Sequence, residues 1–179
     1  GLWDVHIHPD YFNTLADMPL TEQVTLFGSR LRSALLDSGM VGFRCAGAHH
    51  YMDVAWKRAF DSGQHLGPRL FASGHFLTTT GGHFLTSGHA LEVDGPYGWV
   101  KAIREQIKNG VDHIKMNLSG GIMGPDWDQH KHSFLLDDEL KAAFEICKLR
   151  EFKVMAHRSE EHTSELQSLA YLVCRLLLE

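Results

Sequence analysis

The sequence predicts an α/β fold, a partial (β/α)8 barrel of the TIM type that holds only the first five strands. Apolar runs typical of strands alternate along the 179 residues with segments whose apolar positions recur at helical spacing. Such alternation favours a parallel sheet with helical crossovers. No glycine fingerprint of a dinucleotide-binding fold follows the first strand, and no phosphate-binding loop is present. A barrel is therefore favoured over a nucleotide-binding doubly wound sheet.

The predicted strands are short apolar segments that run into loops. The first ends at Pro9, which lacks the N–H group needed to continue a strand ladder. The fourth is followed by Ser119-Gly120-Gly121. The full set covers residues 2–8, 40–46, 69–73, 112–118 and 152–157.

The predicted helices carry apolar residues three or four positions apart. In the first of them, Phe27, Leu31 and Leu35 follow this spacing. Glycine directly after a helix is a typical C-terminal cap, and Gly39 and Gly110 occupy such positions. The four predicted helices cover residues 20–37, 52–61, 97–109 and 136–151.

A long polar segment, residues 74–95, separates the third predicted strand from the third predicted helix. It is rich in glycine, threonine and histidine and includes Thr80-Gly81-Gly82-His83. We expect a loop here, and a loop of this length inside a compact domain is more often functional than idle.

Composition narrows the class of protein. With 179 residues, 44% of them hydrophobic, the chain is large enough for one domain with a core. The net charge of −5 without a basic block gives no reason to expect nucleic-acid binding, and no apolar run reaches the length of a membrane span. The cysteines Cys45, Cys147 and Cys174 are scattered, which favours a reducing compartment and hence a cytoplasmic location.

Four candidate ligands fall at the ends of predicted strands. Residues i and i+2 of a strand point to the same face, so His6 and His8 aim two imidazoles at one spot. Neutral imidazole suits zinc and similar divalent ions. Lys115 and His157 lie near the C-terminal ends of two further strands, where barrel enzymes carry their chemistry. Alternatively, the paired histidines are accidental, Lys115 is an ordinary snorkelling lysine, and His157 is a core histidine.

Residues 1–8 resemble the first-strand motif of the amidohydrolase superfamily of metal-dependent hydrolases. Further stretches are similar to its imidazolonepropionase-like and Xaa-Pro dipeptidase-like branch: residues 66–74, 80–83, 110–116 and 119–123. Together they extend the resemblance to about residue 157.

The resemblance implies a binuclear metal site, with zinc favoured. His6 and His8 would bind one divalent ion, and His157 would bind the second. Lys115 would be carbamylated by CO2 and bridge both ions, because a carbamate offers two anionic oxygens where an ammonium offers none. His83 would be a catalytic and substrate-binding residue that hydrogen-bonds the scissile carbonyl or a substrate carboxylate; alternatively, it is a mere loop residue.

The implied activity is hydrolysis of a carbon–nitrogen bond by a metal-activated hydroxide. A small molecule would be the partner: a dipeptide, an N-acyl amino acid or a cyclic amide. Two alternatives stay open, a single-metal deaminase or lyase on the same scaffold, and a metal-binding or structural βα protein without catalysis.

The segment 158–179 departs from the family pattern and resembles a translated sequencing adapter; alternatively, it is an amphipathic helix that Ser159 caps and whose leucines pack. We therefore expect the barrel part to span residues 1–157 and the rest to be a non-native tail. Five strands cannot close a barrel of eight. The chain would then be a fragment with little or no activity, and its open sheet edges would favour association into a homo-oligomer.

Overall fold

The computed structural model describes residues 1–10, 18–85, 90–121 and 124–158. Most of the segment that resembles an adapter lies outside these residues. The elements, in chain order, are β1 (Leu2–Ile7), α1 (Leu20–Ser38), β2 (Met40–Cys45), η1 (His49–Tyr51), α2 (Met52–Asp61), β3 (Arg69–Phe71), β4 (Phe76–Thr78), β5 (Ala90–Glu92), α3 (Gly95–Asn109), β6 (His113–Asn117), α4 (Asp137–Leu149) and β7 (Lys153–His157).

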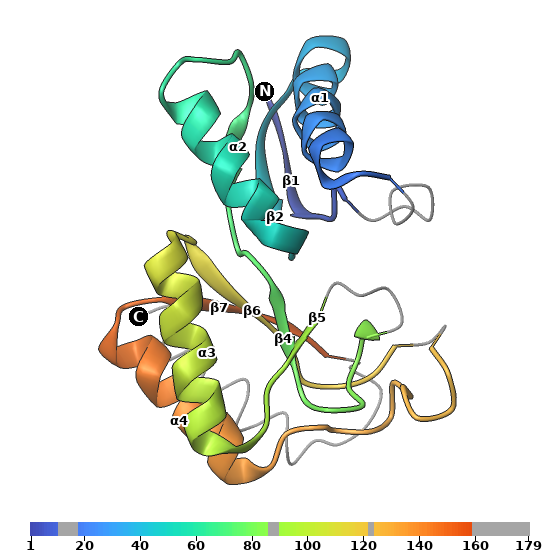
Figure 1. Ribbon diagram of the computed structural model, residues 1–179, viewed down its shortest axis with the longest axis vertical. Coiled ribbons are helices and arrows are strands. Elements are labelled where there is room, and N and C mark those ends of the chain that lie inside the picture. The colour runs from blue at the N-terminus through green and yellow to red at the C-terminus, as the bar shows by residue number, and fades with distance from the viewer. Residues whose placement is uncertain (11–17, 86–89, 122–123, 159–179) are drawn as a thin grey trace.

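The strands form two parallel sheets (Figure 1), one in the order β1-β2-β3 and one in the order β5-β4-β6-β7. The chain passes from β3 in the first sheet through residues 72–75 into β4 in the second, and the third predicted strand, residues 69–73, corresponds to β3. Counting β3 and β4 as one bent strand, the order β1, β2, β3/β4, β6, β7 gives the five parallel strands that the sequence predicted. The described strands form the first part of an α/β barrel and leave it open.

The expectation of one loop over residues 74–95 was wrong at two places. Residues 76–78 form β4 and residues 90–92 form β5, and the two strands pair in parallel. Phe76 and Leu77 are buried in β4. Strands of three residues are too short to show a period-two pattern, and here they are embedded in polar sequence, which hides them from a reading by periodicity.

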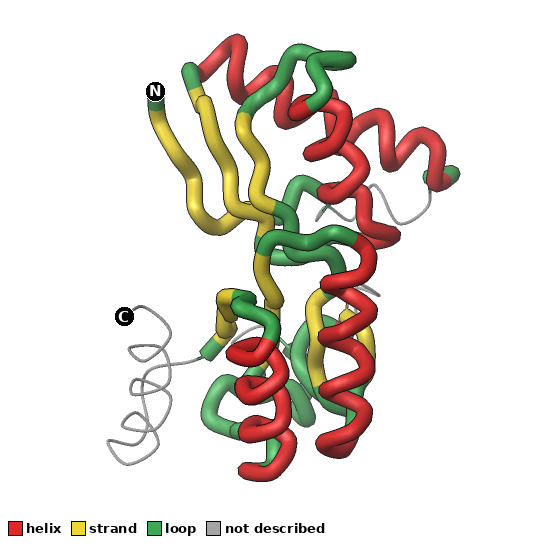
Figure 2. The backbone as a smooth tube through the Cα atoms, turned by 90° about the vertical axis from the view of Figure 1, so that its left-hand side faces the viewer, coloured by secondary structure: helices red, strands yellow, loops and turns green. Residues whose placement is uncertain are grey.

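Two apolar clusters hold the helices against the sheets. Phe27 of α1 and Met52 of α2 pack with β2 and β3, whereas Trp99 of α3 and Cys147 of α4 pack with the second sheet. Figure 2 shows the helices gathered on one side of the strands. On β1, by contrast, Leu2, Trp3 and Val5 are exposed. None of the described helices has the length and apolarity needed to cross a membrane.

Glycines end two helices as predicted. Gly39 follows α1 with φ +66°, and Gly110 follows α3 with φ +95°. Both values lie in the left-handed region, where glycine carries no Cβ penalty. The turn at Gly39 leads into β2, and the turn at Gly110 leads into β6.

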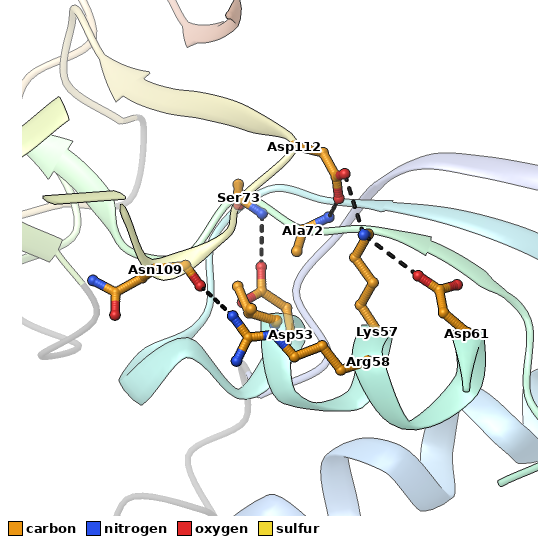
Figure 3. Close-up of polar contacts among 9 residues, drawn as sticks. Asp53, Lys57, Arg58, Asp61, Ala72, Ser73, Asn109 and Asp112 are labelled. Carbon is orange, nitrogen blue, oxygen red and sulfur yellow. Dashed lines mark hydrogen bonds and ion pairs between the residues drawn. The ribbon is translucent and has the colours of Figure 1, made fainter. Parts of the chain in front are cut away.

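A buried carboxylate on α2 holds the bend between β3 and β4, residues 72–75. Asp53 is fully buried, and its Oδ2 accepts hydrogen bonds from the backbone N–H groups of Ser73 (2.7 Å) and Gly74 (2.9 Å). Figure 3 shows the bond to Ser73. Burial raises the pKa of Asp53 to about 6, while hydrogen bonds from Gly74, Ser73 and Val54 oppose the rise. The carboxylate therefore stays mostly ionised at neutral pH, as its role as an acceptor requires.

Asp112, at the start of β6, ties the same bend to the second sheet. One of its oxygens accepts the N–H of Ala72 at 2.8 Å, and the other lies 3.4 Å from Lys57 Nζ of α2. Lys57 also lies 3.4 Å from Asp61, and Arg58 donates to the carbonyl oxygen of Asn109 (Figure 3). Helix α2 is thus the support on which β3, β4 and β6 meet.

We predict that Asp53→Ala lowers the free energy of unfolding by about 2–4 kcal/mol, because the buried N–H groups of Ser73, Gly74 and Val54 lose their acceptor. Urea denaturation followed by circular dichroism measures this. Asp61→Ala is the matched control on the same helix; it removes a surface ion pair and should cost less than about 1 kcal/mol. Equal losses for the two variants would contradict the role given to Asp53.

Candidate functional site

His6 and His8 lie side by side at the C-terminal end of β1. Their Nε2 atoms are 3.2 Å apart, and their ring centroids are separated by 5.2 Å. The ring of His8 also packs against Phe76 and Phe84, with centroid separations of 5.1 and 5.8 Å. The structure thus brings these two predicted ligands together, with the same nitrogen of each ring facing the other.

Lys115 is a buried amine in the middle of β6. The residue is 1% exposed, and its Nζ has no hydrogen-bond partner among the described residues. Its neighbours in register are Phe76 of β4 and Met155 of β7, neither of which carries a charge. Burial, followed by the charge of Arg44, lowers the pKa of Lys115 to about 8. The amine of Lys115 therefore reaches its neutral, nucleophilic form at a lower pH than an exposed lysine does.

His157 ends β7, opposite Asn117 of β6. Burial is the main reason that its pKa falls to about 4; the neighbouring His83, Lys115 and His6 lower it further, and a hydrogen bond with the backbone of Gly120 opposes them. Its Nε2 is buried without a hydrogen-bond partner among the described residues. The neutral imidazole, which is the form that binds a metal, is thus favoured.

His83 follows β4 and lies against His157. The two rings stack, with centroids 4.4 Å apart and planes inclined by 21°. His83 Nδ1 lies 2.8 Å from Oδ2 of Asp128, and its backbone carbonyl oxygen accepts a hydrogen bond from Asn117 Nδ2 at 3.1 Å. His83 is therefore part of the same cluster as the predicted ligand His157.

The predicted residues share one electrostatic neighbourhood. Lys115 lowers the pKa of both His6 and His157, although burial is the larger cause in each case. Within the described ranges, no three side chains of the types His, Cys, Asp and Glu are arranged to hold a metal ion. Lys115 is not of these residue types, and its ammonium form has no lone pair with which to bind a cation.

Three buried polar atoms on β6 and β7 lack hydrogen-bond partners among the described residues: Lys115 Nζ, Asn117 Oδ1 and His157 Nε2. A buried polar atom left unsatisfied costs about 1–3 kcal/mol. Their clustering along β6 and β7 fits a site whose remaining ligand is an ion or a polar molecule.

Two residues of this cluster were missed in the sequence. Asn117 lies inside a strand that was predicted as apolar, and a polar residue at such a position is the one sequence feature that could have marked it as part of a site. Asp128 lies in the loop between β6 and α4. Nothing local marks Asp128, because its partner His83 is 45 residues away along the chain.

We predict that Lys115→Met raises the free energy of unfolding at pH 6.5 by roughly 1–3 kcal/mol in CO2-free buffer. Below pH 8 both the folded and the unfolded chain carry the ammonium, so the cost of burying it is fully present. Between about pH 8 and 10.5 the folded chain releases this proton first, so the gain should shrink. Urea denaturation at both ends of that range measures the effect, and a loss of stability at pH 6.5 would contradict it.

Comparison with known proteins places the chain in a family. The model of the amidohydrolase family matches residues 1–173, a range that enters the adapter-like segment. Ochratoxinase of Aspergillus niger is 29% identical over 187 residues, which cover 88% of this chain and 38% of the ochratoxinase.

Solved structures agree with this placement. A prolidase complexed with N-methylphosphonate-L-proline superposes with a TM-score of 0.80 at 29% identity, over 97% of this chain and 45% of the prolidase. A Xaa-Pro dipeptidase with bound methionine gives 0.78 at 27% identity, over 97% of this chain and 46% of that one. The chain thus spans less than half the length of these relatives. It belongs to the amidohydrolase family.

Proposed function

We propose that the complete protein hydrolyses an amide or peptide bond with the help of two divalent metal ions, zinc being favoured. The observation that carries this proposal is that Lys115, buried in β6, acts electrostatically on His6, which lies beside His8 at the end of β1, and on His157 at the end of β7. When bound, such ions supply a Lewis acid and an activated water. The side chains of the protein would hold these ions and orient the substrate.

His6 and His8 would hold the first ion. Zinc–nitrogen bonds of about 2.0–2.1 Å at a tetrahedral centre place two ligand nitrogens about 3.3 Å apart. The 3.2 Å between the two Nε2 atoms is close to this value. The separation of the two Nε2 atoms therefore supports His6 and His8 as ligands of one ion.

Lys115 would bridge the ions as a carbamate. Its neutral amine attacks the carbon of CO2, a C–N bond forms, and one proton leaves the nitrogen for water, which gives a carboxylate at the end of the side chain. The lowered pKa supports the first step, since the amine must be neutral to attack. His157, neutral and with Nε2 unsatisfied among the described residues, would hold the second ion.

His83 would contact the substrate. The related prolidase was solved with N-methylphosphonate-L-proline and the related Xaa-Pro dipeptidase with methionine, both of which carry an amino-acid carboxylate. We therefore propose a dipeptide or an N-acyl amino acid as the substrate class. His83, stacked on His157, is placed to hydrogen-bond the carbonyl or the carboxylate of such a molecule.

We predict a carbamate on Lys115. With 13C-labelled bicarbonate and zinc present, the chain should give a carbamate carbon signal by NMR. Lys115→Arg should abolish the signal, because a guanidinium does not add CO2. Lys101→Arg, a change at an exposed lysine of α3, is the matched control and should leave the signal intact.

The same zinc-loaded samples also test catalysis, with Xaa-Pro dipeptides and N-acyl amino acids as substrates. We propose that this chain alone shows little or no turnover, since it spans less than half of its relatives. Fast hydrolysis that survives Lys115→Arg would contradict the proposed site, and an absent carbamate signal would contradict the proposed role of Lys115.

A further inference from the structure

We propose that Asp128 is a positioning residue for His83: its carboxylate holds the imidazole as the Nδ1–H tautomer, so that Nε2 is the ring nitrogen left for the substrate. The inference rests on the proposed function, in which His83 contacts the substrate. No feature of the sequence pattern points to Asp128, and its assignment comes from the geometry alone.

The contact between the two side chains is short and buried. His83 Nδ1 lies 2.8 Å from Oδ2 and 3.0 Å from Oδ1 of Asp128. Asp128 is 3% exposed and His83 is 9% exposed. An ionised carboxylate can only accept a hydrogen bond, so Nδ1 must carry the proton that it donates. In the neutral ring Nε2 then has the lone pair.

Gly121 completes the arrangement. Its N–H donates to Oδ1 of Asp128 at 2.9 Å, which fixes the orientation of the carboxylate. A Cβ at position 121 would lie 2.3 Å from Cε1 of His83, so only glycine lets the imidazole sit this close to the loop. One residue therefore orients the acceptor and leaves room for the ring that donates to it.

The remaining sides of His83 are held as well. Asn117 Nδ2 donates to its backbone carbonyl oxygen, and the ring of His157 stacks on its face. With the backbone carbonyl, one ring face and Nδ1 engaged, Nε2 is the ring nitrogen of His83 that can face a substrate. A histidine bound in this way presents Nε2 at a fixed place, which is the purpose of a residue that orients a substrate.

Selective labelling of histidine with 15N tests the proposal on the 179-residue chain without metal. Long-range proton–nitrogen correlation spectra distinguish the two tautomers at a pH where imidazoles are neutral, and His83→Gln identifies the signals of His83. We expect the Nδ1–H form. A His83 found as the Nε2–H form in the unmodified chain would overturn the proposal.

Asp128→Asn supplies the decisive variant. Because the Gly121 N–H still needs an acceptor, the amide oxygen should stay on Gly121 and the amide nitrogen should face His83 Nδ1. An N–H donor at that place should invert the tautomer to Nε2–H. Asp126→Asn, at an exposed aspartate of the same loop, should leave it unchanged. An Asp128→Asn spectrum identical to that of the unmodified chain would overturn the proposal.

The tautomer of His83 does not depend on a bound metal or on a carbamate. The experiment therefore tests the positioning role of Asp128 separately from the proposed metal site. An Nδ1–H ring that inverts in Asp128→Asn, in a chain that shows no carbamate, would uphold the positioning role and reject the proposed metal site. If Asp128→Asn does not fold, the spectrum of the unmodified chain decides the outcome by itself.

Discussion

The fold depends on the bend at residues 72–75, where one barrel strand passes from the first sheet to the second. Two carboxylates hold it, Asp53 from α2 and Asp112 from β6, and both accept backbone N–H groups of the bend. Beyond the bend, β4 pairs with β6 in a register that sets Phe76 beside Lys115. The same register continues to β7 and sets Asn117 beside His157. The position of the candidate site is therefore decided by hydrogen bonds that lie outside it.

The site gathers several basic side chains, and two carboxylates oppose them: Asp128 pairs with His83, and Asp4 raises the pKa of His6 against the other causes. Lys115, His6 and His157 each lose proton affinity, first through burial and then through neighbouring positive groups. Arg44 adds its charge while its Nε donates to the carbonyl oxygen of Val5. Lysine is rarely buried without a partner, and such a place favours neutral nitrogen ligands and a nucleophilic amine. This composition supports the metal and carbamate site proposed above.

The sequence predicted the parts of the molecule that depend on local pattern. The i, i+2 spacing of His6 and His8 was enough to pair them, and the glycines after α1 and α3 were enough to end those helices. The three-residue strands β4 and β5 were missed because they are too short for periodicity and lie in polar sequence. Asp128 was missed because its role exists only through a contact across 45 residues. A contact between residues this far apart in the chain cannot be predicted from the local sequence around either residue.

The central claim is that His6, His8, Lys115 and His157 form one metal-binding site. Anomalous X-ray scattering from crystals of the chain grown with zinc and bicarbonate tests it most directly. The account predicts a zinc peak between the Nε2 atoms of His6 and His8, and a second peak beside His157 with electron density for a carbamate on Lys115. Zinc bound only to surface histidines such as His130 and His132, with an unmodified Lys115, would contradict it.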